Sequence, residues 1–147
     1  MPHTCLVVSD DEAFALLRDL LACERRAMFH AQSGAAALEW LSTRSGPTIL
    51  LVDLPLADMS GSELVASVRD DRKLCRTVAV VCLAAAGARA PQRALRVVRK
   101  PSTPRALVAA VDDARRQLAV WGAAAPESVL DRYFVWRSRR GARGACI

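Results

Sequence analysis

Residues 48–53 read TILLVD, a run of apolar side chains that ends on an aspartate. A short apolar run bounded by polar residues is typical of a strand that is buried on both faces of a sheet. Two other segments have the same character, CLVV at residues 5–8 and VAVVCL at residues 78–83. A sheet buried on both faces needs helices on both sides, so these strands predict an α/β fold.

Between the strands, apolar side chains recur every three or four residues, a spacing that predicts amphipathic helices. The clearest pattern follows Pro104, a residue suited to the first turn of a helix, and Ser102 or Thr103 can cap it. Repeated strand–helix alternation predicts a doubly wound sheet of five parallel strands. Further helices are expected over residues 12–26, from Gly34 and from Gly61, and weaker strands over residues 27–31 and 97–98.

Composition excludes several classes of protein. The 147 residues suit one domain, and a hydrophobic fraction of 52% with 24% charged residues is that of an ordinary globular chain. No apolar run approaches the ~20 residues of a membrane helix, and the N-terminus lacks the basic stretch of a signal peptide. A cytoplasmic protein is expected. Five cysteines without a C-x-x-C pair weigh against a disulfide framework or a zinc site.

Charge is distributed unevenly along the chain. Residues 1–84 carry 8 Lys and Arg against 11 Asp and Glu, a net charge of −3, whereas residues 85–147 carry 13 against 4, a net charge of +9. The second half therefore favours an anionic partner. Solvated helix faces explain the same imbalance equally well.

Charged residues follow three of the predicted strands. Asp10 and Asp11 follow the first strand, Asp53 ends the third, and Lys100 follows the fifth. Ligands of open α/β sheets bind at the carboxyl ends of the strands, where these side chains are expected to meet. Carboxylates suit Mg²⁺, and a lysine opposite them suits a phosphoryl group. Each residue alone has a structural explanation as a helix cap, turn or loop residue, but their joint placement favours a site for phosphoryl transfer.

The chain resembles the receiver domain of two-component response regulators over about residues 4–121. The matching motifs are LVVSDDE at residues 6–12, LLVD at 50–53 with MSG at 59–61, and VRKP at 98–101, and AQSGAAAL at 31–38 resembles the family's second helix with its approach. The resemblance implies a flavodoxin-like receiver fold. It also implies a signalling protein in a phosphorelay rather than an enzyme, with a sensor histidine kinase or phosphotransfer protein as its partner.

The resemblance also implies a role for each site residue. Asp53 would be the phosphoacceptor, and Lys100 would bind the phosphoryl oxygens. Asp11 would bind Mg²⁺ directly and Asp10 through water, while Asp53 and the backbone carbonyl of Pro55 would complete the metal site.

Three departures from the family concern its output. Ala84 stands where the family places a Thr or Ser hydroxyl, and Val97 replaces its usual aromatic switch residue. Only residues 85–96 separate the fourth and fifth strands, so the fourth helix is expected to be reduced to one turn or replaced by a loop. A smaller departure lies after Asp53. The family often has Pro four residues beyond the acceptor, but this position is Ala57 here, and the proline is Pro55.

The last 25 residues form a separate segment. We expect a receiver domain over residues 1–122 and a basic amphipathic extension over 123–147, with an extra helix within residues 127–140. This helix suits packing on the receiver, binding of a protein partner, or contact with nucleic acid or a membrane surface.

Three functions follow from these patterns. The leading one is a stand-alone phosphoacceptor receiver that signals to a downstream protein target by direct contact, with a homodimer left open. The second is an adaptor that works without phosphorylation, and the third is a nucleic-acid-binding regulator that uses the basic half.

Overall fold

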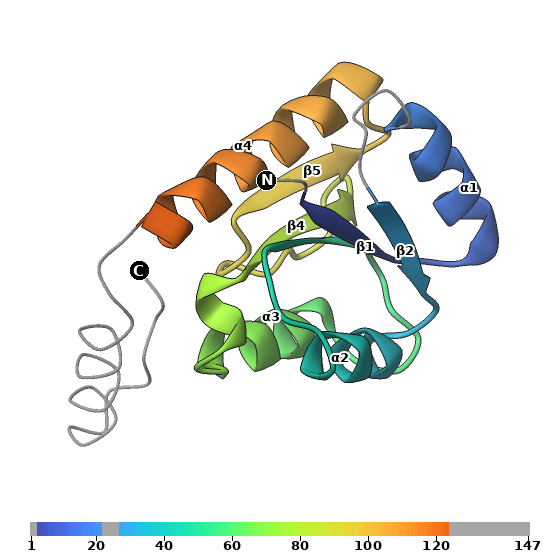
Figure 1. Ribbon diagram of the computed structural model, residues 1–147. Helices are drawn as coiled ribbons and strands as arrows, with labels where there is room; N and C mark the ends of the chain where they lie inside the picture. Colours follow the sequence, from blue (N-terminus) through green and yellow to red (C-terminus); the bar gives the residue numbers. More distant parts are fainter. Residues whose placement is uncertain (1–2, 22–26, 124–147) are drawn as a thin grey trace.

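The computed structural model describes residues 3–21 and 27–123, which form a five-stranded, all-parallel sheet with the order β2-β1-β3-β4-β5 (Figure 1). This arrangement confirms the predicted fold. The strands are β1 (Thr4–Val8), β2 (Ala27–Ala31), β3 (Thr48–Asp53), β4 (Val78–Ala85) and β5 (Arg96–Lys100).

Helices cover both faces of the sheet. Helices α1 and α4 lie on one face, and α2 and α3 lie on the other (Figure 1). The side chains of each strand alternate between the two faces, which gives two hydrophobic clusters. The helices are α1 (Asp11–Leu20), α2 (Gly34–Ser42), α3 (Gly61–Asp70) and α4 (Pro104–Ala123), and the 3₁₀ turn η2 (Leu74–Arg76) precedes β4.

Polar side chains fix where the helices begin. Ser33 caps α2, and Ser60 caps α3 in a reciprocal capping box with Glu63. The Thr103 hydroxyl accepts from the Ala106 amide at 3.1 Å, so Thr103 rather than Ser102 makes the capping contact of α4.

Several predicted boundaries were wrong. Helix α1 ends at Leu20, short of the expected Arg26, and residues 22–26 lie outside the described part of the chain. Strand β4 continues to Ala85 and β5 begins at Arg96, because these two strands pair over five residues each, from Val81↔Arg96 to Ala85↔Lys100. The connection is therefore residues 86–95, which form turns and contain no helix.

The cysteines differ in environment. Cys5 and Cys82 are buried in the core, as expected, and burial raises the pKa of the Cys82 thiol to about 12, so this thiol stays protonated. Cys75, in contrast, is disulfide-bonded, a bond that the argument against a disulfide framework did not anticipate.

Within the described residues, no helix combines the length and apolar character needed to cross a membrane. The predicted extension over residues 123–147, with its helix at 127–140, lies outside the described residues except for Ala123, which ends α4.

Asp58 joins the loop after β3 to the start of α2. Its carboxylate accepts hydrogen bonds from the backbone amides of Gly34, at 3.1 Å, and Ala35, at 2.9 Å. These bonds hold the pKa of Asp58 below its ordinary value, because they stabilise the ionised form. The carboxylate also satisfies amides at a helix N-terminus, where a negative charge is favoured.

Leu107 on α4 is fully buried, so truncating it should leave a cavity between the helix and the sheet. We expect Leu107→Ala to lower the free energy of unfolding by about 2–5 kcal/mol. Leu16→Ala is the matched control, because Leu16 is 61% exposed, and it should change stability by no more than about 0.5 kcal/mol. Urea unfolding compares the two, and equal losses would contradict this packing.

Asp58→Ala should destabilise the protein at neutral pH and progressively less as the pH falls. The lowered pKa of Asp58 means that the folded state prefers the ionised carboxylate. Its contribution is therefore present above the unfolded value, near 3.8, and is lost as the pH falls through the lower folded value. Unfolding free energies of wild type and variant, measured from neutral pH to acid, should converge. Asp19→Ala is the control, because Asp19 is exposed and its carboxylate forms no hydrogen bond or ion pair with another described residue.

Candidate functional site

Parallel pairing brings the ends of β1, β3, β4 and β5 to one edge of the sheet. Val8 of β1 lies opposite Val52 of β3, and Asp53 lies opposite Leu83 of β4. Residues that follow these strands therefore gather above the same edge, as expected for a doubly wound sheet.

Asp53 and Lys100 are brought together, as the sequence predicted. The Lys100 ammonium forms an ion pair with the Asp53 carboxylate and also donates to the backbone carbonyl of Leu54 at 2.8 Å. Their side chains are 20% exposed for Asp53 and 36% for Lys100, so the pair is accessible from solvent. A carboxylate oxygen and a cation at one accessible point suit an incoming anionic group.

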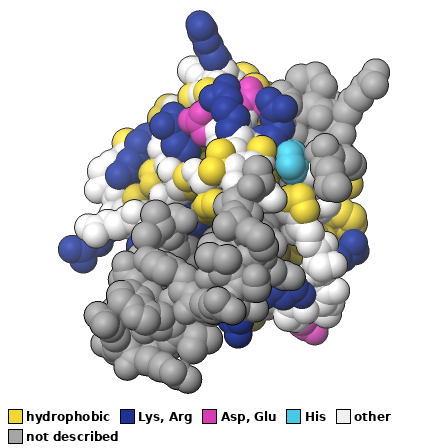
Figure 2. Space-filling model, turned by 60° about the vertical axis from the view of Figure 1, so that its left-hand side comes forward, with side chains coloured by type: hydrophobic (Ala, Val, Ile, Leu, Met, Phe, Trp, Pro, Cys, Tyr) yellow, Lys and Arg dark blue, Asp and Glu magenta, His cyan; other side chains and the backbone are white. Residues whose placement is uncertain are grey.

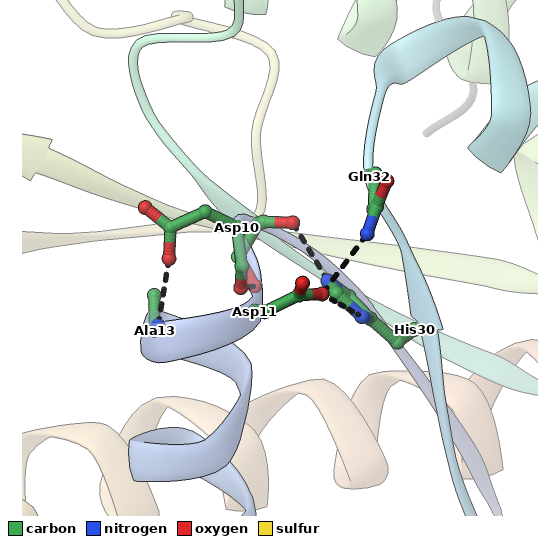
Figure 3. Close-up of polar contacts among 6 residues, drawn as sticks. Asp10, Asp11, Ala13, His30 and Gln32 are labelled. Atoms are coloured by element: carbon green, nitrogen blue, oxygen red, sulfur yellow. Dashed lines mark hydrogen bonds and ion pairs between the residues drawn. The ribbon is translucent and has the colours of Figure 1, made fainter.

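The Asp10 carboxylate acts as a helix cap. It accepts a hydrogen bond from the Ala13 amide at 2.7 Å at the start of α1 (Figure 3). The backbone of Asp10 is extended, as in other N-cap residues. The structural explanation that the sequence offered for Asp10 is therefore correct for its side chain, whatever further role it has.

The Asp11 carboxylate points toward β2. It accepts a hydrogen bond from Gln32 at 2.9 Å and lies 3.7 Å from Nδ1 of His30 (Figure 3). Nε2 of His30 lies 2.7 Å from the carbonyl oxygen of Ser9. Because a carbonyl only accepts hydrogen bonds, Nε2 is the nitrogen that carries a proton here. The ring also stacks on Phe14 at 4.4 Å between centroids, so His30 is fixed beside Asp11.

The three carboxylates do not converge. Within residues 3–21 and 27–123, no group of three or more His, Cys, Asp or Glu side chains is placed to hold a metal ion. In this arrangement Asp10 and Asp11 are engaged by local partners, Ala13 and Gln32, so the shared metal site of Asp10, Asp11 and Asp53 stays a prediction.

The donor set nevertheless fits Mg²⁺ in its chemistry. Asp11, Asp53 and the Pro55 carbonyl would supply hard oxygen ligands from one edge of the sheet, which Mg²⁺ prefers. The side chain of Asp11 is 82% exposed, so it can turn toward Asp53 once it leaves Gln32.

Both positions that depart from the family pattern pack in the core. Ala84 on β4 is 1% exposed, and Val97 on β5 packs against the same hydrophobic cluster. Ala84 offers no hydroxyl, and Val97 offers no ring that could swing between two positions. This side of the site is therefore apolar and filled.

The sequence did not single out His30 and Gln32 beside Asp11, or Asp58 in the loop after β3. His30 lies on β2, which pairs with β1, and Gln32 follows that strand and donates a hydrogen bond to Asp11. Asp58 accepts a hydrogen bond from the backbone amide of Gly34 at the start of α2. The sequence carried one usable signal. Residues at the carboxyl end of β2 lie at the same edge as those after β1, so polar side chains there are neighbours of Asp11.

Within residues 85–123, four of the seven arginines form ion pairs with acidic residues. Asp113 binds both Arg96 and Arg116, and Asp112 lies 3.7 Å from Arg115. Figure 2 shows acidic side chains among the Lys and Arg side chains on one face of the described part. The described part of the basic half therefore has a surface of mixed charge around α4 and β5.

Comparison with known proteins places these features in a family. No family model matches the chain. The polar-differentiation response regulator DivK of Brucella anthropi is 30% identical over 86 residues, which are 58% of this chain and 68% of DivK. A putative response regulator of Chloroflexus aurantiacus shares the fold with a TM-score of 0.67 and 27% identity, covering 81% of this chain and 99% of that one. The receiver domain of TorR, the TMAO respiratory system response regulator, gives a TM-score of 0.67 and 25% identity over 80% and 99%. Together with the strand-end site, these similarities show that the chain belongs to the response-regulator receiver family.

Proposed function

We propose that this chain is a phosphoacceptor receiver in a phosphorelay, phosphorylated on Asp53 with Mg²⁺. The observation that carries the proposal is the ion pair between Asp53 and Lys100 at the carboxyl end of the sheet. Membership of the receiver family supports it, because such domains take a phosphoryl group from a sensor histidine kinase or a phosphotransfer protein.

The proposed step is an in-line displacement at phosphorus. One oxygen of the Asp53 carboxylate attacks the phosphorus of a phosphohistidine, and a P–O bond forms while the P–N bond breaks. The bonding electrons leave with the imidazole nitrogen. Lys100 then exchanges its pairing with Asp53 for a phosphoryl oxygen, which keeps the charge balanced.

Asp11, Asp53 and the Pro55 carbonyl would hold Mg²⁺, with Asp10 acting through water. Bound there, the ion would neutralise charge on the phosphoryl oxygens. For this to happen, the Asp11 carboxylate leaves Gln32 and turns toward Asp53. Asp10 acts through water most readily if it keeps its bond to Ala13.

The proposed output is direct contact with a downstream protein. Ala84 and Val97 provide neither the hydroxyl nor the ring of the usual relay, and residues 86–95 contain no helix. The change that a partner detects would therefore occur at the carboxyl ends of the strands, where Asp53 and Lys100 change partners. It would not depend on the movement of an aromatic side chain.

The same observations favour a second candidate, an adaptor that works without phosphorylation. An adaptor of this kind requires only that the surface of the protein bind a partner equally well whether or not Asp53 is phosphorylated. The nucleic-acid-binding alternative has weaker support, because acidic residues neutralise several arginines of α4 and β5.

Incubation with acetyl phosphate and Mg²⁺ should add one phosphoryl group to the wild-type protein, seen by mass spectrometry of the intact chain. Asp53→Asn should abolish the product, because the substitution removes the nucleophile. Asp58→Asn is the matched control, since Asp58 lies five residues away and accepts hydrogen bonds from the first amides of α2, and the variant should still be modified. No product in wild type, or a product that persists in Asp53→Asn, would leave the adaptor as the better explanation.

Gln32→Ala should tighten Mg²⁺ binding. The Gln32–Asp11 hydrogen bond must break before Asp11 reaches the ion, and a bond worth ~1 kcal/mol corresponds to roughly fivefold in affinity. Isothermal titration calorimetry measures this, with Gln117→Ala on α4 as the control. Weaker binding in Gln32→Ala would mean instead that Gln32 presents Asp11 to the ion.

A further inference from the structure

A groove lies between α3 and residues 86–95, the helix-free connection between β4 and β5. Its volume is about 410 Å³, with Ser62, Val65 and Ala66 of α3 on one side and residues 89–93 on the other. This volume lies within the range of small ligand sites in proteins. The ion pair between Asp53 and Lys100 and the hydrogen bond from Lys100 to Leu54 do not involve the residues that line the groove.

Hydrogen bonds hold the wall formed by the connection in place. The buried Arg69 of α3 donates from Nε to the carbonyl of Arg93 at 3.2 Å, and the Arg93 guanidinium pairs with Asp70 at 2.9 Å. Arg99 of β5 donates to the carbonyls of Ala85 and Ala88, at the other end of the connection. The wall is thus tied to α3 and β5, so the groove is preformed and binding would require little ordering.

The floor of the groove is apolar. Val65 is 1% exposed, and Pro91 is buried at the same place. Ala90 packs on the hydrophobic cluster beneath, and Ala66 is a small residue that leaves the groove open. Such a floor accepts one apolar side chain of moderate size.

The rim of the groove is positively charged. Arg89 is exposed and makes no ion pair within the described residues, while Arg93 has Asp70 as its acidic partner. Among the described residues that line the groove, two are arginines and none is acidic. This excess of cationic groups attracts an acidic ligand.

We propose that this groove binds an acidic peptide segment of a partner protein, with one apolar side chain on the floor and a carboxylate on Arg89. The charge of the rim argues against the chain's own C-terminal segment. Residues 124–147 carry five arginines against two acidic residues, so they have the same sign as the rim.

The test uses the full chain and a phage-displayed library of random seven-residue peptides. Enriched sequences should carry an Asp or Glu next to an apolar residue. A synthetic peptide from the selection, labelled with fluorescein, then gives the affinity by fluorescence anisotropy. Its charge-reversed version, with Lys for each acidic residue, should bind at least about tenfold more weakly.

Two variants assign the binding to the groove. Ala66→Trp should fill it and abolish binding, and Arg89→Glu should weaken binding about tenfold or more. Arg105→Glu is the control for charge, because Arg105 is exposed at the start of α4, outside the groove, and it should bind like wild type. Circular dichroism checks that each variant is folded. If Ala66→Trp fails to fold, Ser62→Phe on the same wall replaces it.

The proposal is overturned if no peptide is enriched over the bare support, if enriched peptides are basic, or if binding survives both groove variants. It would also be overturned if single-stranded DNA displaced the peptide and bound more tightly in its place. Phosphorylation of Asp53 is measured separately, so failure of this proposal and failure of the proposed function give different results.

Discussion

Strand β3 lies between β1 and β4; it pairs with β4 over its whole length and with β1 over residues 48–52, and residues 49–52 are excluded from water. A strand in this position must satisfy its backbone groups through its neighbours and cannot slip without exposing apolar side chains. This constraint places Asp53 opposite Leu83 of β4. Lys100 reaches Asp53 because β5 is paired in turn with β4, so the ion pair at the site is a consequence of strand register.

The fold and the Asp53–Lys100 pair could be predicted from the sequence because both depend on burial, which leaves a periodic pattern. The direction of the Asp11 side chain could not. Asp11 is exposed, and its carboxylate can face either Gln32 and His30 or the end of β3. The choice between these orientations depends on a free-energy difference of ~1 kcal/mol, the net contribution of one hydrogen bond. Element ends were missed for a related reason, since Ala84 and Ala85 favour a strand or a turn about equally until β5 pairs with them.

The burial of Arg69 is not evident from the sequence. Arg69 lies among exposed charges in the sequence, yet the residue is only 5% exposed, and its guanidinium lies 5.2 Å from the ring of Trp121 while it donates to carbonyls at Cys75 and Arg93. Burial lowers the pKa of this guanidinium, with Arg93 as a smaller cause. A buried cation of this kind persists because several acceptors and a ring face replace its water. Arg69 therefore joins α3, η2, α4 and the helix-free connection in one network.

Strand β5 pairs on one side only within the described part of the sheet, so its outer backbone groups are available to another strand. Open sheet edges of this kind invite intermolecular stacking and aggregation, and lysines or other charges along the edge oppose it. Three of the five residues of β5 are charged, Arg96, Arg99 and Lys100. A second copy of the strand laid alongside would place like charges next to one another. The charges of β5 therefore oppose edge-to-edge pairing of two copies of the chain.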